Sequence, residues 1–263
     1  MFPFIYIFGK AIGMYGICMM IGLCLSCFLA IRRGKRYGIC ADDIIIVTAT
    51  AFGFAIACGV LLYAFVTYPV KALLFMLKNG DLGMENLGIV FYGGLIGGIF
   101  GAWVGTKIAK TGIATLVPAI VPFIPLGHAI GRIGCLMAGC CHGMEYDGIF
   151  AVHYPQSVLG LSPHQGYFPV QPLESVLNLA IFAILLRLAD RVKRNADLLF
   201  AYLSMYASSR FVLEFFRGDE ARGSFLHIST SQWISLGLLL SSSLFFCFSR
   251  REKAEIETEI PQV

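Results

Sequence analysis

The sequence predicts an all-α integral membrane protein with seven transmembrane helices. The 263-residue chain is 57% hydrophobic and only 14% charged, a composition that excludes an ordinary soluble domain. The charges fall in clusters, and the uncharged runs between them approach the roughly 20 residues needed to cross a bilayer. We expect spans at residues 11–31, 43–66, 90–109, 115–137, 172–188, 198–216 and 230–249.

No linker is long enough for a second folded unit. We therefore expect residues 1–263 to form a single polytopic membrane domain, with an external polar loop around residues 138–171. The positions of lysine and arginine predict its orientation, because cytoplasmic loops are enriched in them. Thirteen of the 20 basic residues follow the first, third, fifth and seventh spans, and five lie in the opposite loops. This places the N-terminus outside and the C-terminus in the cytoplasm.

Two further features limit the function classes. The net charge of +4 follows from this topological bias, so no nucleic-acid partner is expected. The first span is followed by its basic cluster rather than preceded by it, which indicates a retained span and not a cleaved signal peptide.

The first and third spans contribute aromatic residues and glycines at their outer ends. Tyr15 fits either an interfacial anchor or a substrate contact. Four glycines of the third span share one helix face, which allows close approach by a neighbouring helix: Gly93, Gly97, Gly101 and Gly105. The adjacent Gly93 and Gly94 also weaken the helix start and expose N–H groups to a ligand beside Tyr92.

The fourth span carries an arginine at membrane depth. His128, Arg132 and Cys135 fall within about 60° of one another on a helix and form one polar stripe. A small-residue stripe lies beside it, made of Gly127, Gly131 and Gly134. Arg132 could snorkel to the surface, but its position on a stripe facing the bundle favours a functional role.

The fifth and sixth spans add the remaining charges. Glu174 lies near a helix start, where the helix dipole alone favours a carboxylate. Tyr206 and Arg210 share a face of the sixth span, and Glu214 is placed to pair with Arg210 at i,i+4. With Arg132 these groups leave a surplus of positive charge. We therefore expect an outer-leaflet site for an anionic phospholipid, whose phosphate arginine binds bidentately.

Three of the nine cysteines cluster around the end of the fourth span, at Cys135, Cys140 and Cys141. Cys140, Cys141 and His142 are adjacent, which is a poor spacing for one metal ion but suits a thiolate beside a base. A zinc site would need a fourth ligand, for which His153 or His164 are the candidates. We expect no bound metal and no cofactor.

The residues singled out above resemble the motifs of the bacterial prolipoprotein diacylglyceryl transferases, over most of the chain. Tyr15-Gly16 resembles the first-helix Tyr-Gly of that family, and residues 91–97 resemble its His-Gly-Gly-Leu-Ile-Gly motif. Arg132 and Gly143 match its signature Gly-Arg-x-Gly-Asn-Phe-x-Asn-x-Glu-x-x-Gly. The other matches are Pro169, Gln171 and Glu174 of a Pro-Ser-Gln-x-x-Glu segment, and Tyr206, Arg210, Phe211, Glu214, Phe215, Phe216 and Arg217 of a Tyr-x-x-x-Arg-Phe-x-x-Glu-Phe-Phe-Arg block.

The resemblance implies a seven-span enzyme of the bacterial inner (plasma) membrane. Such enzymes move the diacylglyceryl group of phosphatidylglycerol to the lipobox cysteine of a prolipoprotein and release glycerol phosphate. It implies that Arg132 and Arg210 hold the phosphate. The remaining residues expected at the site are Tyr15, Gly93, Gly94, Cys135, Gly143, Gln171, Glu174, Tyr206 and Glu214.

The chain departs from the family pattern at the chemistry. Tyr92 replaces the motif histidine, Cys135 and Ala138 replace the two signature asparagines, and Cys140 replaces the signature glutamate. One hypothesis is a transferase for a lipobox cysteine or another thiol, with Tyr92 or His142 supplying the base. A second is a paralogue that binds an anionic phospholipid, in which Cys140 acts as nucleophile or redox thiol. A third is a lipid-binding membrane protein without catalysis.

Overall fold

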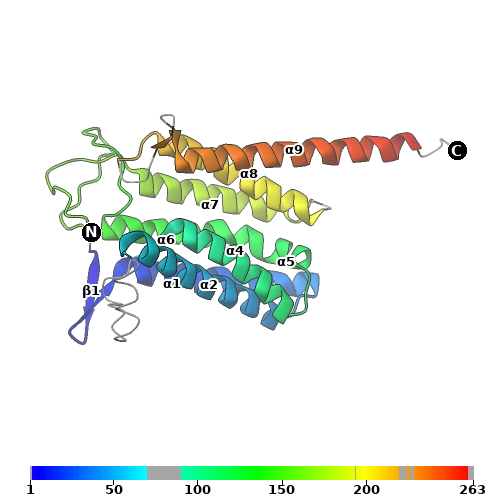
Figure 1. Ribbon diagram of the computed structural model, residues 1–263, viewed down its shortest axis with the longest axis horizontal. Coiled ribbons are helices and arrows are strands. Elements are labelled where there is room, and N and C mark those ends of the chain that lie inside the picture. The colour runs from blue at the N-terminus through cyan, green and yellow to red at the C-terminus, as the bar shows by residue number, and fades with distance from the viewer. Residues whose placement is uncertain (1, 70–89, 193, 219–223, 226–227, 260–263) are drawn as a thin grey trace. The chain divides into compact units, whose positions relative to one another are not determined.

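The computed structural model describes residues 2–69, 90–192, 194–218, 224–225 and 228–259 and is helical over most of them (Figure 1). The α-helices are α1 (Met14–Gly34), α2 (Ala41–Thr67), α4 (Phe91–Ile108), α5 (Ile113–Ile120), α6 (Ile124–Ala138), α7 (Val170–Leu188), α8 (Asn195–Glu214) and α9 (Thr230–Glu259). The 3-10 helices are η1 (Lys35–Tyr37) and η3 (Val121–Phe123). Two antiparallel hairpins pair β1 (Phe4–Ile7) with β2 (Lys10–Gly13) and β3 (Ser224–Phe225) with β4 (Ile228–Ser229).

The helical membrane class predicted from the sequence is confirmed. Among the described residues, five helical segments are long and apolar enough to cross a membrane: Met14–Tyr37, Ala41–Thr67, Ile113–Ala138, Val170–Leu188 and Thr230–Ser249. The third and sixth predicted spans form α4 and α8, which lie outside this set. In α8 the charges of Asp197, Arg210 and Glu214 lower the mean hydropathy.

The first, fourth and seventh expected spans differ from the helices in the structure. The first helix begins at Met14 and not at residue 11, because residues 10–13 pair as a strand of the β1–β2 hairpin. The fourth span is interrupted by η3, where Pro122 and the neighbouring Pro118 and Pro125 remove backbone N–H donors. Helix α9 continues past residue 249 to Glu259.

Two compact units make up the chain, one of residues 30–116 and one of residues 1–29 with 117–263. In the first unit α2 packs against α4 along the predicted glycine face. A Cβ added at any of Gly93, Gly97, Gly101 or Gly105 would fall less than 3.0 Å from an atom of α2. The expectation that this stripe allows close helix packing is confirmed.

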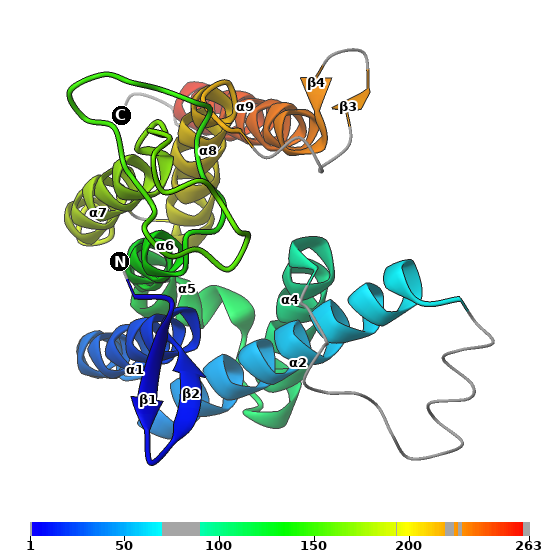
Figure 2. The same ribbon diagram turned by 90° about the vertical axis from the view of Figure 1, so that its left-hand side faces the viewer.

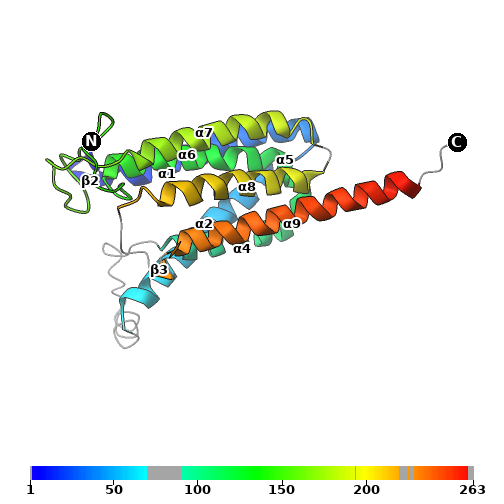
Figure 3. The same ribbon diagram turned by 90° about the horizontal axis from the view of Figure 1, so that it is seen from above.

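In the second unit α6 packs on α7, α7 on α8 and α8 on α9, a row of helices that Figure 1 shows in this order. The last two helices of the row, α8 and α9, also lie side by side in Figure 3. The small-residue stripe of α6 faces α1: a Cβ on Gly134 would lie 2.8 Å from the Cys18 Cβ. Apolar residues of α5, η3, α7 and α8, with Ala189 just after α7, form a buried cluster at one end of the row: Val117, Val121, Ile181, Leu185, Ala189 and Leu198. The opposite end of α6 carries the polar residues.

The loop of residues 139–169 folds back across that polar end of the row (Figure 2). The Val158 N–H donates to the Ala138 carbonyl at 3.0 Å, and the Met144 N–H donates to the Phe216 carbonyl, just after α8, at 2.9 Å. These bonds tie one loop to the ends of α6 and α8, which fixes the backbone around the three clustered cysteines.

Candidate functional site

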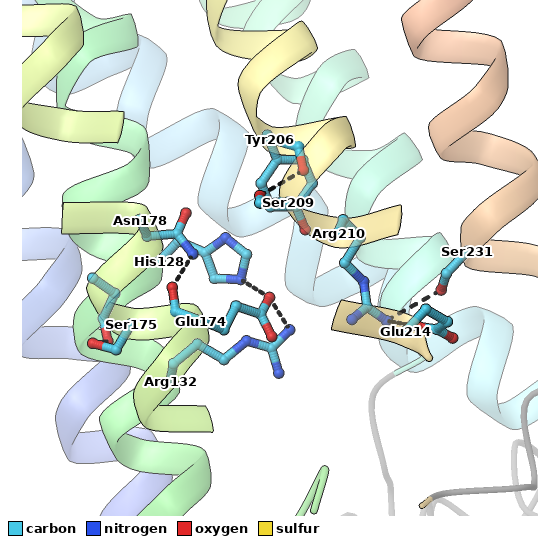
Figure 4. A network of polar contacts seen from close by, with 11 residues as sticks. His128, Arg132, Glu174, Ser175, Asn178, Tyr206, Ser209, Arg210, Glu214 and Ser231 are labelled. Atoms are coloured by element: carbon cyan, nitrogen blue, oxygen red, sulfur yellow. Dashed lines mark hydrogen bonds and ion pairs between the residues drawn. The ribbon is translucent and has the colours of Figure 1, made fainter. Parts of the chain in front are cut away.

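An ion pair between α6 and α7 fixes Arg132 (Figure 4). Its Nη2 lies 2.9 Å from Oε1 of Glu174; the Glu174 side chain is buried and the Arg132 side chain is 11% exposed. His128, one turn earlier on α6, places Nε2 3.6 Å from the same oxygen. The expected polar stripe of α6 therefore meets a carboxylate of the next helix, not the membrane surface.

The dipole of α7 does not by itself explain the position of Glu174. It is the fifth residue of α7, and the first turn of that helix contains no acidic residue. The side chain is 3% exposed and is close enough to Arg132 and Arg210 to interact electrostatically with both. Asn178 Nδ2 donates to the Glu174 carbonyl at 2.8 Å. We conclude that Glu174 is part of the arginine site.

Arg210 is positioned mainly by a residue of its own helix, α8, and also contacts α9. Its Nη2 lies 2.5 Å from Oε2 of Glu214, the i,i+4 pair predicted from the spacing, and donates to Ser231 Oγ at 3.3 Å. The Tyr206 ring, one turn before Arg210, lies 5.4 Å from the His128 ring, measured between centroids. In Figure 4 the two guanidinium groups approach the same region from α6 and α8.

Each arginine keeps a buried donor that its glutamate does not use. Among the described residues, Arg132 Nε and Arg210 Nη1 are buried and have no hydrogen-bond partner. A buried N–H without an acceptor is costly, and native proteins rarely keep one without a functional reason. Two such donors from two helices suit an anionic oxygen ligand.

The charge balance differs from the one the sequence predicted. Arg132, Arg210 and Glu214 alone would leave one positive charge in excess, but Glu174 cancels it. Arg217, just after α8, supplies a further cation that acts electrostatically on Glu174 and Arg210. The surplus of one positive charge is therefore restored by Arg217, which was not among the site residues expected from the sequence.

The clustered cysteines meet at the end of α6. The Sγ atoms of Cys135, Cys140 and Cys141 all lie within 4.8 Å of one another. Helix α6 ends at Ala138, the left-handed φ of 68° at Gly139 turns the chain back, and the Cys140 N–H then donates to the Cys135 carbonyl at 3.1 Å. Cys141 adopts a φ of 56°, uncommon for a residue with a Cβ and typical of strained functional sites.

The two loop thiols differ in acidity. Hydrogen bonds from Cys135 and Cys140 lower the pKa of the Cys141 thiol far below its ordinary value, and Arg132 and Arg217 act in the same direction. For Cys140, the hydrogen bond with Cys135 lowers the pKa, but the hydrogen bond with Cys141 and burial outweigh it and raise the pKa to about 11. One thiolate stabilised by neighbouring thiols accounts for both shifts.

Gln171 positions Cys140 through its backbone. The fully buried amide donates from Nε2 to the Cys140 carbonyl at 3.0 Å and to the Tyr154 hydroxyl at 2.7 Å. Tyr154 is itself fully buried, and burial raises its pKa to about 12 even though the hydrogen bond from Gln171 lowers it. Gln171, expected to bind substrate, thus holds the cysteine loop.

His142 and Gly143 anchor the loop to the end of α8. His142 Nδ1 lies 2.9 Å from the Gly143 carbonyl, and since that oxygen only accepts, Nδ1 is the donor. The His142 ring packs edge-on against Tyr167, with centroids 5.0 Å apart. Gly143 pairs with Arg217 in an isolated antiparallel bridge. The base role expected for His142 would fall to Nε2.

The remaining predicted residues lie on α1 and α4. Tyr15 is half-exposed, and its backbone lies against α6, 3.2 Å from a Cβ built on Gly134. Tyr92, Gly93 and Gly94 begin α4 in the other unit. Gly93 packs on α2, and the Gly94 N–H is not exposed to a ligand as expected, because it donates to the Val90 carbonyl at 3.1 Å. Their roles toward a substrate stay predictions.

Four residues that lie at the site were not predicted from the sequence: Tyr154, Asn178, Arg217 and Ser231. Ser231 gave no signal, since a serine at the start of a helix is ordinary. Arg217 stood in the recognised Phe-Phe-Arg block and could have been added from that motif alone.

Comparisons with known proteins show the family of the chain. A sequence profile described as prolipoprotein diacylglyceryl transferase matches residues 3–248. The phosphatidylglycerol–prolipoprotein diacylglyceryl transferase 2 of Clostridium perfringens (strain 13 / Type A) is 31% identical over 242 residues, 91% of this chain and 92% of that protein. Enzymes of the same name, without the number, match at 28% in Dehalococcoides mccartyi (strain ATCC BAA-2266 / KCTC 15142 / 195), over 92% of this chain and 91% of the relative, and at 29% in Clostridium tetani (strain Massachusetts / E88), over 94% and 97%.

Proposed function

Because the chain belongs to the prolipoprotein diacylglyceryl transferase family, we propose that it transfers the diacylglyceryl group of phosphatidylglycerol to a cysteine thiol of a prolipoprotein. It is a transferase of lipoprotein biosynthesis. The observation that carries the proposal is the pair of buried, unpartnered donors, Arg132 Nε and Arg210 Nη1, presented by two helices of a membrane protein.

The phosphate of the lipid binds to these two arginine donors. Its anionic oxygens accept hydrogen bonds from both guanidinium groups, while Glu174 and Glu214 keep the guanidinium groups in position. The phosphodiester carries one negative charge before the reaction, and the departing phosphate monoester carries two. Fixed positive charge beside that group therefore stabilises the transition state more than the ground state.

The acceptor is the lipobox cysteine of a prolipoprotein. Its thiolate sulfur attacks the glycerol carbon that bears the phosphate, the sulfur–carbon bond forms, and the carbon–oxygen bond breaks. The electron pair leaves with glycerol phosphate, and the thiol proton passes to a base. Tyr92 and His142 are the proposed base or orienting groups, and Tyr15 and Tyr206 line the lipid path.

The reaction takes place in the outer leaflet of the bacterial inner membrane. Residues 1–263 form one multi-pass domain with seven spans, in which α4 and α8 cross the membrane together with the five apolar segments. The N-terminus lies outside and the C-terminus in the cytoplasm, as the positive charges of the loops favour. The loop of residues 139–169 then faces the side on which prolipoproteins present their cysteine.

The direct test is a transfer reaction with purified full-length protein in phosphatidylglycerol-containing nanodiscs and a lipobox peptide. Mass spectrometry should detect a diacylglyceryl thioether on the peptide cysteine. A peptide with serine in place of that cysteine, and nanodiscs of phosphatidylcholine alone, serve as matched controls and should give none. Absence of the thioether, while the Clostridium perfringens relative forms it under the same conditions, would contradict the proposal.

One observation favours a second candidate, in which Cys140 itself acts as nucleophile or redox thiol on a bound anionic phospholipid. The grouping of three Sγ atoms within 4.8 Å allows a disulfide after modest movement. Intact-mass measurement would detect a covalent lipid adduct or the loss of two hydrogens. A Cys140→Ser protein that retains full transfer activity would exclude the nucleophilic role.

A further inference from the structure

Three thiols converge where the sequence departs from its family's pattern. Cys135 lies in the last turn of α6, and Cys140 and Cys141 follow the reversal at Gly139. Their Sγ atoms lie within 4.8 Å of one another, with Cys135 buried and the other two half-buried. No other histidine, cysteine or acidic residue joins this group within the part of the chain that the structure describes.

From this geometry we infer that Cys135, Cys140 and Cys141 bind a zinc ion through three thiolates, and that the acceptor thiol occupies its fourth position. Zinc prefers four ligands in a tetrahedron, and catalytic zinc sites leave one position for water or substrate. With zinc–sulfur bonds of about 2.3 Å, tetrahedral sulfurs stand about 3.8 Å apart. The observed separations exceed that by no more than about 1 Å, within the reach of side-chain rotation.

The surroundings compensate the charge of such a site. Three thiolates and a divalent cation carry one net negative charge, which is costly to bury alone. Arg132 and Arg217 are near enough to Cys141 to interact with it electrostatically. The backbone is fixed as well, because Gln171 and the Cys135 carbonyl bind the peptide groups of Cys140. A prearranged ligand loop beside cations is what a thiolate-rich zinc site needs.

The ion would activate the nucleophile of the reaction, an inference that rests on the proposed function. A thiol bound to zinc loses its proton, which is released to water, so no separate strong base is required. The bound thiolate sulfur then forms the bond to the glycerol carbon as the carbon–oxygen bond to the phosphate breaks. Cys135 is one turn from Arg132 on α6, which places the ion beside the phosphate.

Metal content tests the site without any catalysis. Full-length protein purified under reducing conditions, loaded with zinc and dialysed, should retain one equivalent per chain by elemental mass spectrometry. Cys135→Ser, Cys140→Ser and Cys141→Ser should each weaken zinc binding by more than about 100-fold. Cys24→Ser and Cys247→Ser, exposed thiols of α1 and α9, are the matched controls and should retain it.

Unmutated protein provides a second readout that does not depend on folding of the variants. Zinc should protect Cys135, Cys140 and Cys141 from maleimide, and a chelator should restore their labelling, with Cys40, an exposed thiol just before α2, labelled equally in both states. In cobalt-substituted protein, a lipobox peptide should change the visible spectrum when its thiol binds the ion. The same peptide with serine should leave the spectrum unchanged.

The outcomes separate this inference from the proposed function. Less than a tenth of an equivalent of zinc on reduced protein, or a disulfide among the three thiols in the active protein, would overturn the zinc site. Transfer at full rate by metal-free protein would overturn the activation role and leave the transferase function standing. Stoichiometric zinc and a cobalt response to the peptide, without any thioether product, would support the site and contradict the proposed function.

Discussion

The two arginine–glutamate pairs of the site are built in different ways. Arg210 and Glu214 are four residues apart on α8 and can pair whenever that helix forms. Arg132 and Glu174 belong to α6 and α7 and meet only when those helices pack. The first pair is a property of one segment, whereas the second is a property of the fold.

The difference shows how a membrane protein can keep buried arginines available to an anionic ligand. An arginine alone in an apolar interior is costly, and a glutamate partner reduces that cost. In both pairs the glutamate takes only part of the guanidinium, and Arg132 Nε and Arg210 Nη1 remain for another acceptor. One arginine is positioned by its own helix and the other by its neighbour, so a phosphate bound by both would join α6 and α8.

Removing either arginine should produce the largest effect. We expect Arg132→Ala and Arg210→Ala each to reduce diacylglyceryl transfer about 100- to 1,000-fold, as for loss of one donor to a developing anion. Arg→Lys at either position keeps the charge but loses the planar fork, so its activity should fall between alanine and arginine. Initial rates in phosphatidylglycerol nanodiscs measure this. An alanine variant with undiminished activity would remove that arginine from the phosphate site.

Replacing the glutamate of each pair should lower the free energy of unfolding by different amounts. Glu174→Gln leaves Arg132 buried without its ion pair, at a cost of about 3–5 kcal/mol in the free energy of unfolding. Glu214→Gln should cost less, because Arg210 keeps Ser231 and its place on α8. Unfolding in detergent compares the two variants. A larger loss for Glu214→Gln would show that the pair within α8, and not the one between α6 and α7, supports the fold.

A double variant serves as the control for that comparison. Replacing a buried ion pair with apolar residues of similar volume is often neutral or stabilising. Arg132→Met combined with Glu174→Met should therefore unfold at or above the temperature of Glu174→Gln, yet show no transfer. Such a result would assign the pair to positioning the phosphate and not to holding α6 and α7 together.

Features that depend on one segment could be predicted from the sequence, whereas features that depend on the packing of two segments could not. Helix positions, the glycine faces and the Arg210–Glu214 pair depend on spacing along one segment, and the structure confirms them. The partner of Arg132 depends on which helix packs against α6, and periodicity carries no such information. Glu174 could therefore be explained equally well by the dipole of α7 until its side chain was located.

The sequence groups the three cysteines at the end of one span, but the convergence of their Sγ atoms could not be predicted, for a geometric reason. Cys135 on a helix and Cys140 and Cys141 in a loop look poorly spaced for one metal ion when the chain is imagined continuing straight. The left-handed residue Gly139 reverses the backbone and brings all three Sγ atoms within 4.8 Å. A glycine after the last helical residue is a known stop signal, but the direction of the chain beyond it depends on tertiary contacts.

A smaller effect is expected at His128, which supports the pair between α6 and α7. Its Nε2 lies 3.6 Å from Glu174, while its ring packs near Tyr206. His128→Phe keeps an aromatic ring and removes the polar nitrogens, and should lower transfer by about tenfold or less, because only one long polar contact is lost. The Michaelis constant and turnover number for the lipid distinguish positioning from chemistry. A loss as large as that of Arg132→Ala would instead indicate direct participation.

Replacing Ser231, which contacts Arg210 of the Arg210–Glu214 pair, should have the smallest effect on transfer. Its Oγ accepts from Arg210 Nη2 at 3.3 Å, a long hydrogen bond that supplements the ion pair with Glu214. Ser231→Ala should therefore reduce transfer no more than about threefold. Ser241→Ala, an exposed serine on the same helix α9, is the matched control and should have no effect. A loss above tenfold in Ser231→Ala would mean that α9, and not α8 alone, positions Arg210, and the two arginines would then both depend on a neighbouring helix.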